Sequence, residues 1–315
     1  MLLSPNEDQV QILDFLDGLS KPYTSVPMHD ISFALTSDAL DQALVEGGFL
    51  DVMAIPELGA VTAAMVVERL ARLPFTVEAA ASALVRPMLD GDLPRPICLI
   101  EEGQLRKPVR FLQPGASVVV VGPSGVFSFV ATDADVRHAG DEPLFAYPMA
   151  FLTALPVAAA MRRHAADPGD VLRQWRVALA AEAAGLLAAA LHSTVSHVSD
   201  RKQFGRPLAT FQALRHRLAV AQVMSNGCYW LALKAAGTGD ADDAALAALH
   251  AQETAKLVTY DYHQFFGAMG VTLEHPLHLW TYRLKALTSE LGGRGEQALA
   301  AADAIWGAKA LEPAR

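Results

Sequence analysis

The stretch Arg-Lys-Gln-Phe-Gly-Arg-Pro-Leu-Ala-Thr-Phe-Gln, residues 201–212, separates two long segments whose apolar residues recur at helical spacing. Gly205 permits backbone angles that other residues avoid, and Pro207 fixes φ and lacks an amide donor. Together they predict a sharp break between two helices. We expect Thr210 to cap the second helix, which restarts at Phe211.

Three cationic side chains gather at this break: Arg201, Lys202 and Arg206. A phosphate group suits such a corner, because arginine offers it a planar, forked set of donors. On spacing alone, a solvated basic loop without a ligand is the more frequent arrangement. The sequence around the break is compatible with a phosphate site and with a solvated loop.

Composition predicts a mainly helical protein that buries surface in an oligomer. Hydrophobic residues make up 52 % of the 315 residues, charged residues only 19 %, and alanine is abundant. A chain of this length has room for two or three domains. The formal net charge of −9 argues against nucleic-acid binding.

The sequence lacks the motifs of several other functional classes. The first residues lack the cationic start and apolar run of a signal peptide, and no uncharged stretch approaches the length of a membrane span. Cys98 and Cys228 are interpreted as buried thiols in a reducing cytoplasm. His275 and His278 have helical spacing but no third partner, so we predict no metal site. A dinucleotide fingerprint and a phosphate loop are also absent.

The apolar pattern divides the chain into three parts: 1–92, 93–165 and 166–315. In the first part, helices are expected from a cap at Ser4 and over residues 37–50, 62–73 and 77–89. In the second, short β-branched runs predict strands at 97–100, 109–112, 118–121 and 126–130. In the third, helices are expected over 167–198, 211–236, 241–266, 276–291 and 296–306. Long helices joined by short turns indicate a four-helix bundle.

Two motifs resemble those of the acyl-CoA dehydrogenase family. The run at 201–212 is similar to the family's Arg-x-Gln-Phe-Gly-x-Pro-Leu-x-x-Phe-Gln turn between bundle helices, and residues 264–276 resemble its Gln-x-x-Gly-Gly-x-Gly-x-x-x-Glu-x-Pro run. The resemblance implies a mainly α fold with an N-terminal helical domain, a small β-domain and a C-terminal four-helix bundle. Its order matches the three parts of the chain, and the β-domain is reduced relative to the family.

The resemblance also implies contacts with the ADP half of an FAD that a neighbouring subunit mainly binds. The matching residues are Arg201, Gln203, Phe204, Gly205, Gln212, Gln264, Gly267 and Gly270. Ala268 stands where the family usually has a second glycine. The family's Thr-Glu-Pro-Gly-Ser-like loop, which holds the flavin ring, has no counterpart: residues 99–103 occupy its place without a hydroxyl side chain.

The resemblance places a catalytic glutamate, which takes the α-proton of the acyl-CoA, at one of two positions. The first is on the opening bundle helix, where this chain has Trp175, and the second is a Glu-Gly turn, where a gapless count reaches Leu291. Glu290 lies one residue away and is kept as a candidate base, with a carboxylate near solvent as the alternative. Glu182, two turns from Trp175, is interpreted as part of an ion pair that faces a partner.

We therefore expect a cytoplasmic subunit of a flavin-dependent acyl-CoA dehydrogenase, which lacks a base and completes the FAD site of a sibling chain. The implied partners are that sibling in an α2β2 complex, an acyl-CoA substrate such as a bulky or steroid-derived ester, and an electron-transfer flavoprotein. The first alternative is a competent homo-oligomeric enzyme with Glu290 as base. The second, of another class, is a flavin-free helical interaction protein.

Overall fold

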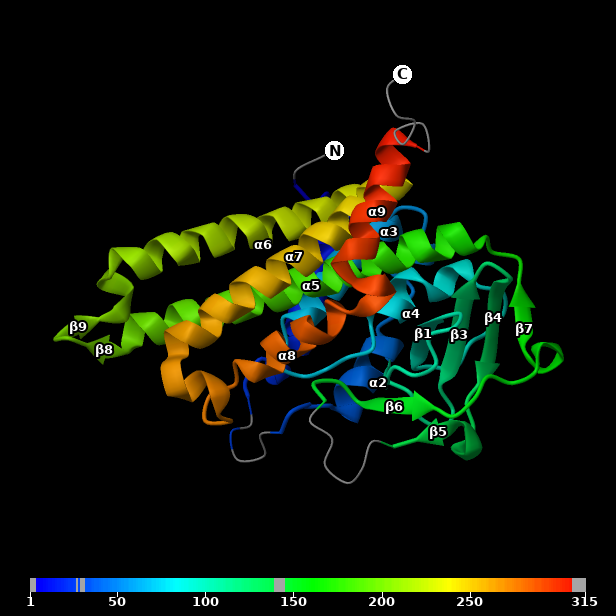
Figure 1. The fold of residues 1–315 in the computed structure, drawn as a ribbon, viewed down its shortest axis with the longest axis horizontal. Helices are drawn as coiled ribbons and strands as arrows, with labels where there is room; N and C mark the ends of the chain where they lie inside the picture. Colours follow the sequence, from blue (N-terminus) through cyan, green and yellow to red (C-terminus); the bar gives the residue numbers. More distant parts are fainter. Residues whose placement is uncertain (1–3, 27, 29–31, 139–144, 308–315) are drawn as a thin grey trace, which may run out of the picture.

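The computed structural model describes residues 4–26, 28, 32–138 and 145–307. The fold is mainly helical with a small β region, which confirms the predicted class (Figure 1). The first part contains α1 (Glu7–Ser20), α2 (Asp38–Glu46), α3 (Gly59–Ala71) and α4 (Ala80–Leu84). The second contains β1 (Ile97–Glu101), β2 (Val109–Arg110), β3 (Ser117–Gly122), β4 (Gly125–Val130), β5 (Val136–Arg137), β6 (Met149–Leu152) and β7 (Arg162–His164). The third contains α5 (Pro168–Asp200), β8 (Lys202–Gln203), β9 (Arg206–Pro207), α6 (Gln212–Thr238), α7 (Ala241–Phe266), α8 (His278–Leu287) and α9 (Gly293–Trp306).

The N-terminal helices begin where side chains satisfy their first amides. Asn6, and not the predicted Ser4, caps α1, because it forms a capping box with Gln9. Ser37 caps α2 as predicted, with Leu40 N donating to its hydroxyl. The helix expected over 77–89 is shorter: α4 ends at Leu84, and a 3-10 turn follows it.

The β region forms two small sheets with a core of their own. One has the strand order β1-β3-β4-β7, in which β1 and β3 are parallel and the other pairs antiparallel. The second sheet pairs β2 with β6 and β6 with β5. Some of their apolar residues, with Val118, Val120 and Ala150 among them, form a cluster of their own. Others, with Val119, Val121 and Val126 among them, belong to the helical core.

The helices of the first and third parts share one continuous core. Its centre is α5, which contacts α3, α6, α7 and α8. The approach of α3 to α5 requires a glycine, since a Cβ at Gly185 would lie 2.1 Å from the backbone oxygen of Glu68. Among the described helices, α5 alone is long and apolar enough to cross a membrane, but 78 % of its apolar window is buried inside the fold. That burial is typical of a core helix.

Candidate functional site

The predicted break after α5 is present, and it contains a small hairpin that the sequence pattern did not reveal. β8 and β9 pair Lys202 with Pro207 and Gln203 with Arg206, and the hairpin projects beyond one end of the bundle, at the left of Figure 1. Phe204 at its tip has φ 52° and is 88 % exposed, and Gly205 follows with φ 78°. Two successive left-handed residues turn the chain back on itself.

Thr210 does not cap the next helix, so that prediction was wrong. Its hydroxyl donates instead to Pro207 O at 2.7 Å, within the 3-10 turn that precedes α6. The N-cap residue of α6 is Phe211, which makes no side-chain capping bond. The ring of Phe211 lies under the Arg206 guanidinium, 4.2 Å from ring centroid to Cζ. The start of α6 thus has a contact between Arg206 and Phe211 but no side-chain cap.

The second motif, after α7, comes to the same end of the molecule as the hairpin. His197 near the end of α5 stacks on Phe266 at the end of α7, with ring centroids 3.9 Å apart. Gly267 then turns the chain with φ 60°, and no atom lies within 4 Å of where its Cβ would be. Gly270 is buried, and a Cβ there would meet His263 O at 2.7 Å, so packing alone accounts for this glycine.

The predicted cofactor residues on this end are mostly open to solvent. The exposed ones are Arg201, Gln203, Phe204, Gly205, Gln212, Gln264 and Gly267. Within the described ranges, no salt bridge neutralises Arg201 or Lys202. An exposed cationic corner next to open glycine backbone fits the phosphate half of a dinucleotide. That these residues bind FAD stays a prediction.

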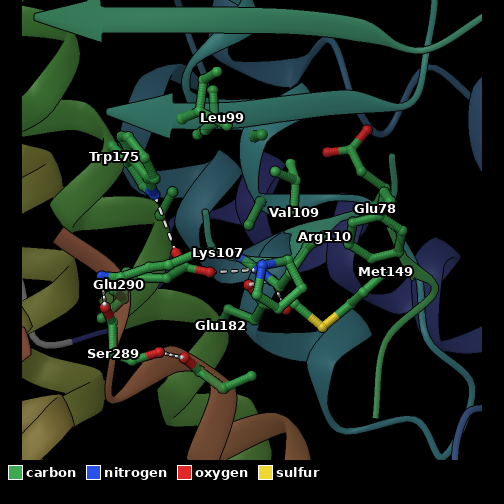
Figure 2. A pocket seen from close by; sticks show the side chains of 18 of the residues that line it. Glu78, Leu99, Lys107, Val109, Arg110, Met149, Trp175, Glu182, Ser289 and Glu290 are labelled. Carbon is green, nitrogen blue, oxygen red and sulfur yellow. Dashed lines mark hydrogen bonds and ion pairs between the residues drawn. The ribbon is translucent and has the colours of Figure 1, made fainter. Parts of the chain in front are cut away.

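The structure has a second candidate site, a cavity of about 630 Å³ between the β region and α5 and α8. Figure 2 shows Trp175 and Glu182 of α5 facing Arg110 of β2 and Glu290 of the turn after α8. Apolar side chains form much of the wall: Leu99, Ile100, Phe111, Met149, Ala178 and Leu179. Trp175 and Leu291, the two positions at which the resemblance implies a catalytic glutamate, thus line the same cavity.

Arg110 is held between two carboxylates in this cavity. Its Nη1 donates to both oxygens of Glu182, at 2.9 and 3.1 Å, and its Nε lies 2.5 Å from Glu290 Oε1 (Figure 2). Trp175 Nε1 donates to Glu290 Oε2 at 3.2 Å, and the Tyr147 hydroxyl donates to Glu182 Oε1 at 2.8 Å. These five residues form what we call the Arg110 cluster: Arg110, Tyr147, Trp175, Glu182 and Glu290.

The structure changes the interpretation of both acids: the solvated alternative for Glu290 does not hold, and the ion pair predicted for Glu182 forms within its own chain. Glu290 does not lie near solvent, since only 16 % of its side chain is exposed. Glu182 does not face a partner, because it is buried and paired with Arg110 of its own chain. The sequence pattern could not reveal Arg110 and Tyr147, which lie 72 and 35 residues from Glu182 and meet it only through the fold.

An unusual turn positions Glu290. Leu291, the next residue, has φ 51° and ψ 41°, and Gly292 also has a positive φ. Gln252 of α7 holds this turn by donating to Leu287 O at 2.9 Å and to Glu290 O at 3.0 Å. A left-handed leucine is rare and persists only where the surroundings fix it, which is common at functional sites.

Two effects act on the pKa of Glu290 in opposite directions. Burial raises the pKa of Glu290 above its ordinary value, while the Arg110 guanidinium acts to lower it. A carboxylate with a raised pKa in a cavity has the basicity that proton abstraction requires. However, one oxygen faces Arg110 and the other receives the Trp175 N–H. Taking up a proton would remove the charge with which Glu290 pairs with Arg110, and this pairing makes Glu290 a poor candidate for a base.

One further constellation resembles a hydrolytic triad but lacks its proton arrangement. His164 Nε2 lies 2.8 Å from Ser128 Oγ, but its Nδ1 accepts from the backbone N–H of Asp90. Nε2 therefore carries the proton and donates to the serine, which is the reverse of what a general base does. Both side chains are buried. In the described part of the chain, no group of three acidic, His or Cys side chains suits a metal ion.

Comparisons with known proteins converge on one family. The family model described as "Acyl-CoA dehydrogenase, C-terminal domain" matches residues 169–305. The chain is 29 % identical to acyl-CoA dehydrogenase IpdE2 of Mycolicibacterium smegmatis over 239 residues, or 72 % of this chain and 76 % of that protein. It is 36 % identical to acyl-CoA dehydrogenase FadE34 of Mycobacterium tuberculosis over 124 residues, which is 37 % of this chain and 17 % of that protein.

Solved structures share the whole fold. A variant of the Tcur3481–Tcur3483 steroid ACAD has a TM-score of 0.72 at 23 % identity and covers 96 % of this chain and 99 % of that chain. The ChsE4–ChsE5 complex of Mycobacterium tuberculosis has a TM-score of 0.72 at 18 % identity and covers all of both chains. At these identities, the likeness concerns the fold alone.

Proposed function

Because this chain belongs to the acyl-CoA dehydrogenase family, we propose that it is a subunit of a heteromeric, flavin-dependent member. It completes the ADP side of an FAD site in a sibling chain, and the sibling supplies the catalytic base. In the assembled enzyme, FAD supplies the hydride acceptor for the α,β-desaturation of an acyl-CoA thioester.

The state of Glu290 carries this proposal. Arg110 and Trp175 engage its two oxygens, so the carboxylate next to the position expected for the base serves in a half-buried ion pair. The charge of Arg110 compensates those of the two glutamates, and losing one of these charges would leave another uncompensated in the cavity. Taking a substrate proton would break the pairing. A subunit without a working base needs a sibling that has one.

The distance between the two candidate sites supports a shared FAD site. α5 carries Trp175 at the cavity and ends at Asp200 beside the hairpin, and 25 helical residues extend about 37 Å. Figure 1 places the hairpin and the β region at opposite ends of the molecule. The hairpin of one chain is therefore far from the cavity of the same chain. This separation supports a cofactor that contacts the hairpin of one chain and has its ring in another subunit.

Exposed apolar residues near the hairpin half of the bundle support the presence of a partner. On α6, Val220 and Val223 are 58 % and 71 % exposed, and on α7, Leu257 and Tyr260 are 55 % and 68 % exposed. α6 and α7 are neighbours, and exposed apolar side chains on neighbouring helices are typical of a subunit interface.

The named relatives suggest the kind of partner. The structural neighbours include the Tcur3481–Tcur3483 steroid ACAD, the ChsE4–ChsE5 complex and an electron-transferring flavoprotein of Acidaminococcus fermentans. We accordingly propose a sibling acyl-CoA dehydrogenase as the partner, an electron-transfer flavoprotein as the acceptor and a bulky, steroid-derived acyl-CoA as the substrate.

Co-expression tests the proposal. The isolated chain is expected to purify with little or no FAD, because its flavin-ring side lacks the hydroxyl-bearing loop, and a sibling from the same host should restore a flavin spectrum to the complex. The measurement is FAD per protomer by absorbance after denaturation. Stoichiometric FAD on the isolated homo-oligomer would refute the shared site. Lack of flavin in both samples would favour a flavin-free interaction protein.

A second candidate, the homo-oligomeric enzyme with Glu290 as base, keeps one observation in its favour. Glu290 lines the cavity, and burial raises its pKa toward the range that suits a general base. For Glu290 to work, substrate binding would have to displace Arg110 from it. Turnover of the acyl-CoA by Glu290→Gln, compared with Glu182→Gln in the assembled complex, separates this candidate from the first.

A further inference from the structure

His278, the first residue of α8, has a backbone carbonyl oxygen at each nitrogen of its buried ring. Nδ1 lies 3.1 Å from His275 O in the turn before the helix, and Nε2 lies 3.0 Å from Ser32 O, 246 residues away in the chain. A carbonyl oxygen only accepts hydrogen bonds, and a neutral imidazole has a single N–H donor. Both bonds therefore form together only when the ring carries a positive charge.

His263 of α7, a neighbouring histidine with two partners, differs in the chemistry of one of them. Its Nδ1 lies 2.6 Å from Gly270 O, and its Nε2 lies 2.9 Å from the hydroxyl of Thr281. A hydroxyl group rotates and can donate as well as accept, so a neutral His263 satisfies both contacts. Burial lowers the pKa of His263, which also favours the neutral ring. Neither partner of His278 can donate in this way.

The contact with Ser32 attaches a short segment to α8. Residues 32–35, which we call the strap, also place Phe33 on the ring of Tyr282, with centroids 5.9 Å apart and planes 15° apart. At the other end of the strap, Leu35 O accepts a hydrogen bond from Thr76 N at 2.6 Å. Tyr282 lines the cavity, so the strap supports part of the cavity wall from behind.

We propose that His278 is a pH-dependent tie, whose charged ring holds the strap on α8 and whose neutral ring gives up one of the two bonds. The docked strap then binds the proton more tightly than the released strap, so docking must weaken as the pH rises. A histidine in water exchanges this proton near pH 6.5, which places the change close to neutral pH. This inference does not rest on the proposed subunit role.

The titratable groups that face His278 stay uncharged near neutral pH. His263 of α7 and His275 of the preceding turn are neutral there, because burial lowers the pKa of both, that of His275 to about 4. Tyr282 of α8 presents its ring at 73°, with centroids 6.2 Å apart. In the described ranges, no carboxylate lies within ion-pair distance of the His278 ring. The start of a helix disfavours a positive charge, so the two carbonyl oxygens are the groups that favour it.

Amide hydrogen exchange of the full chain tests the tie, with the Thr76 amide as the reporter, because it bonds to Leu35 O of the strap. After correction for the intrinsic effect of pH, this amide is expected to exchange about tenfold or more faster at pH 9 than at pH 6, since one bond from a charged donor contributes that factor. The Thr281 amide, which bonds to Leu277 O within α8, should not change. A Thr76 rate independent of pH, or an equal change in both amides, would overturn the proposal.

Two variants separate the tie from the general effect of a buried histidine. His278→Gln keeps an amide donor but cannot be charged, so exchange at Thr76 should be independent of pH and close to the native rate at pH 9. His263→Gln is the matched control, and it should keep the native tenfold change. Persistence of the change in His278→Gln, or its loss in both variants, would show that His278 does not tie the strap.

Nitrogen-15 chemical shifts of the histidine rings in the native chain make the test independent of whether the variants fold. The His278 ring, identified by its contact with Phe33, should have two protonated nitrogens at pH 6 and one at pH 9. His263 should have one at both values. A single protonated nitrogen on His278 at pH 6 would refute the charged tie, whatever the exchange rates.

Discussion

Glu290 has both oxygens engaged, by Arg110 at 2.5 Å and by Trp175 at 3.2 Å. Loss of a working general base lowers the rate about 10²- to 10⁴-fold. We expect Glu290→Gln, in the assembled complex, to lower turnover of its acyl-CoA by less than about threefold. Steady-state kinetics with equal FAD content measures this.

Glu182→Gln is the matched control, because it removes the same charge from the other side of Arg110. The two variants should behave alike if both acids only pair with the guanidinium. A hundredfold loss confined to Glu290→Gln would identify Glu290 as the base and favour the homo-oligomeric enzyme.

For individual residues, the sequence indicated the positions near the candidate base but not how their side chains are arranged. A gapless count reached Leu291, and the structure explains the ambiguity: Leu291 adopts a left-handed conformation, so helical geometry does not apply to this turn. Arg110 was missed because it lies on a two-residue strand, with no pattern of its own. Pairing across 72 residues to Glu182 depends on tertiary structure, which periodicity does not encode.

Among the elements, the β8–β9 hairpin carries the strongest prediction about the cofactor. Arg201 is exposed and forms no salt bridge within the described ranges. A charge-assisted contact with a phosphate contributes about 1.5–3 kcal/mol. We expect Arg201→Ala to weaken FAD binding by the heteromeric complex about 10- to 100-fold, as measured by equilibrium titration. Thermal unfolding without cofactor should stay nearly unchanged.

Arg106→Ala controls for the loss of one exposed positive charge, because Arg106 lies in the loop after β1, away from the hairpin. It should leave FAD affinity unaffected. If Arg201→Ala also has native affinity, the hairpin binds no phosphate, and the solvated-loop interpretation holds.

The sequence predicted the long helices well because each carries a sustained apolar stripe and clear ends. The helix expected over 241–266 begins and ends at those residues, and the one expected over 167–198 is observed as Pro168–Asp200. Short elements were less predictable. β8 and β9 have only two residues each, which is too few for a periodic pattern. The cap of α1 is Asn6 and not Ser4, and the sequence could not distinguish them because serine and asparagine are both good capping residues.

For the whole molecule, a histidine group makes stability depend on pH. His197, Phe266 and His275 lie in mutual contact where α5 and α7 end. Burial, followed by the charges of His197 and His278, lowers the pKa of His275 to about 4. In the unfolded chain, a histidine binds its proton near pH 6.5. The unfolded state therefore binds more protons between about pH 6.5 and 4, and stability must fall as the pH falls through this window.

His275→Asn removes this titration and can still accept the bond that Leu277 N donates to the ring. We expect its melting temperature to drop less between pH 7 and pH 5 than that of the native chain, measured by circular dichroism. His192→Asn, at an exposed position on α5, should behave like the native chain. Equal drops for all three proteins would show that His275 does not contribute to the pH dependence.

The overall architecture followed from the sequence, but the sharing of the core did not. Apolar periodicity shows which face of a helix is buried, but it does not show which element covers that face. The contact of α3 with α5 at Gly185 joins the first and third parts of the chain in one core. The β region contributes Val119 and Val121 to this core and has a second cluster of its own. The division at 1–92, 93–165 and 166–315 remains a proposal.

The buried position of α5 has a consequence for synthesis. A ribosome completes residues 168–200 before it makes α6, α7 and α8, which cover this helix in the finished fold. Until residue 287 has emerged, the nascent chain carries a segment whose composition suits a lipid bilayer and for which α3 and α4, but not yet all of α6, α7 and α8, are available as neighbours. During that interval the same apolar surface that later forms the core is open to aggregation and to chaperones.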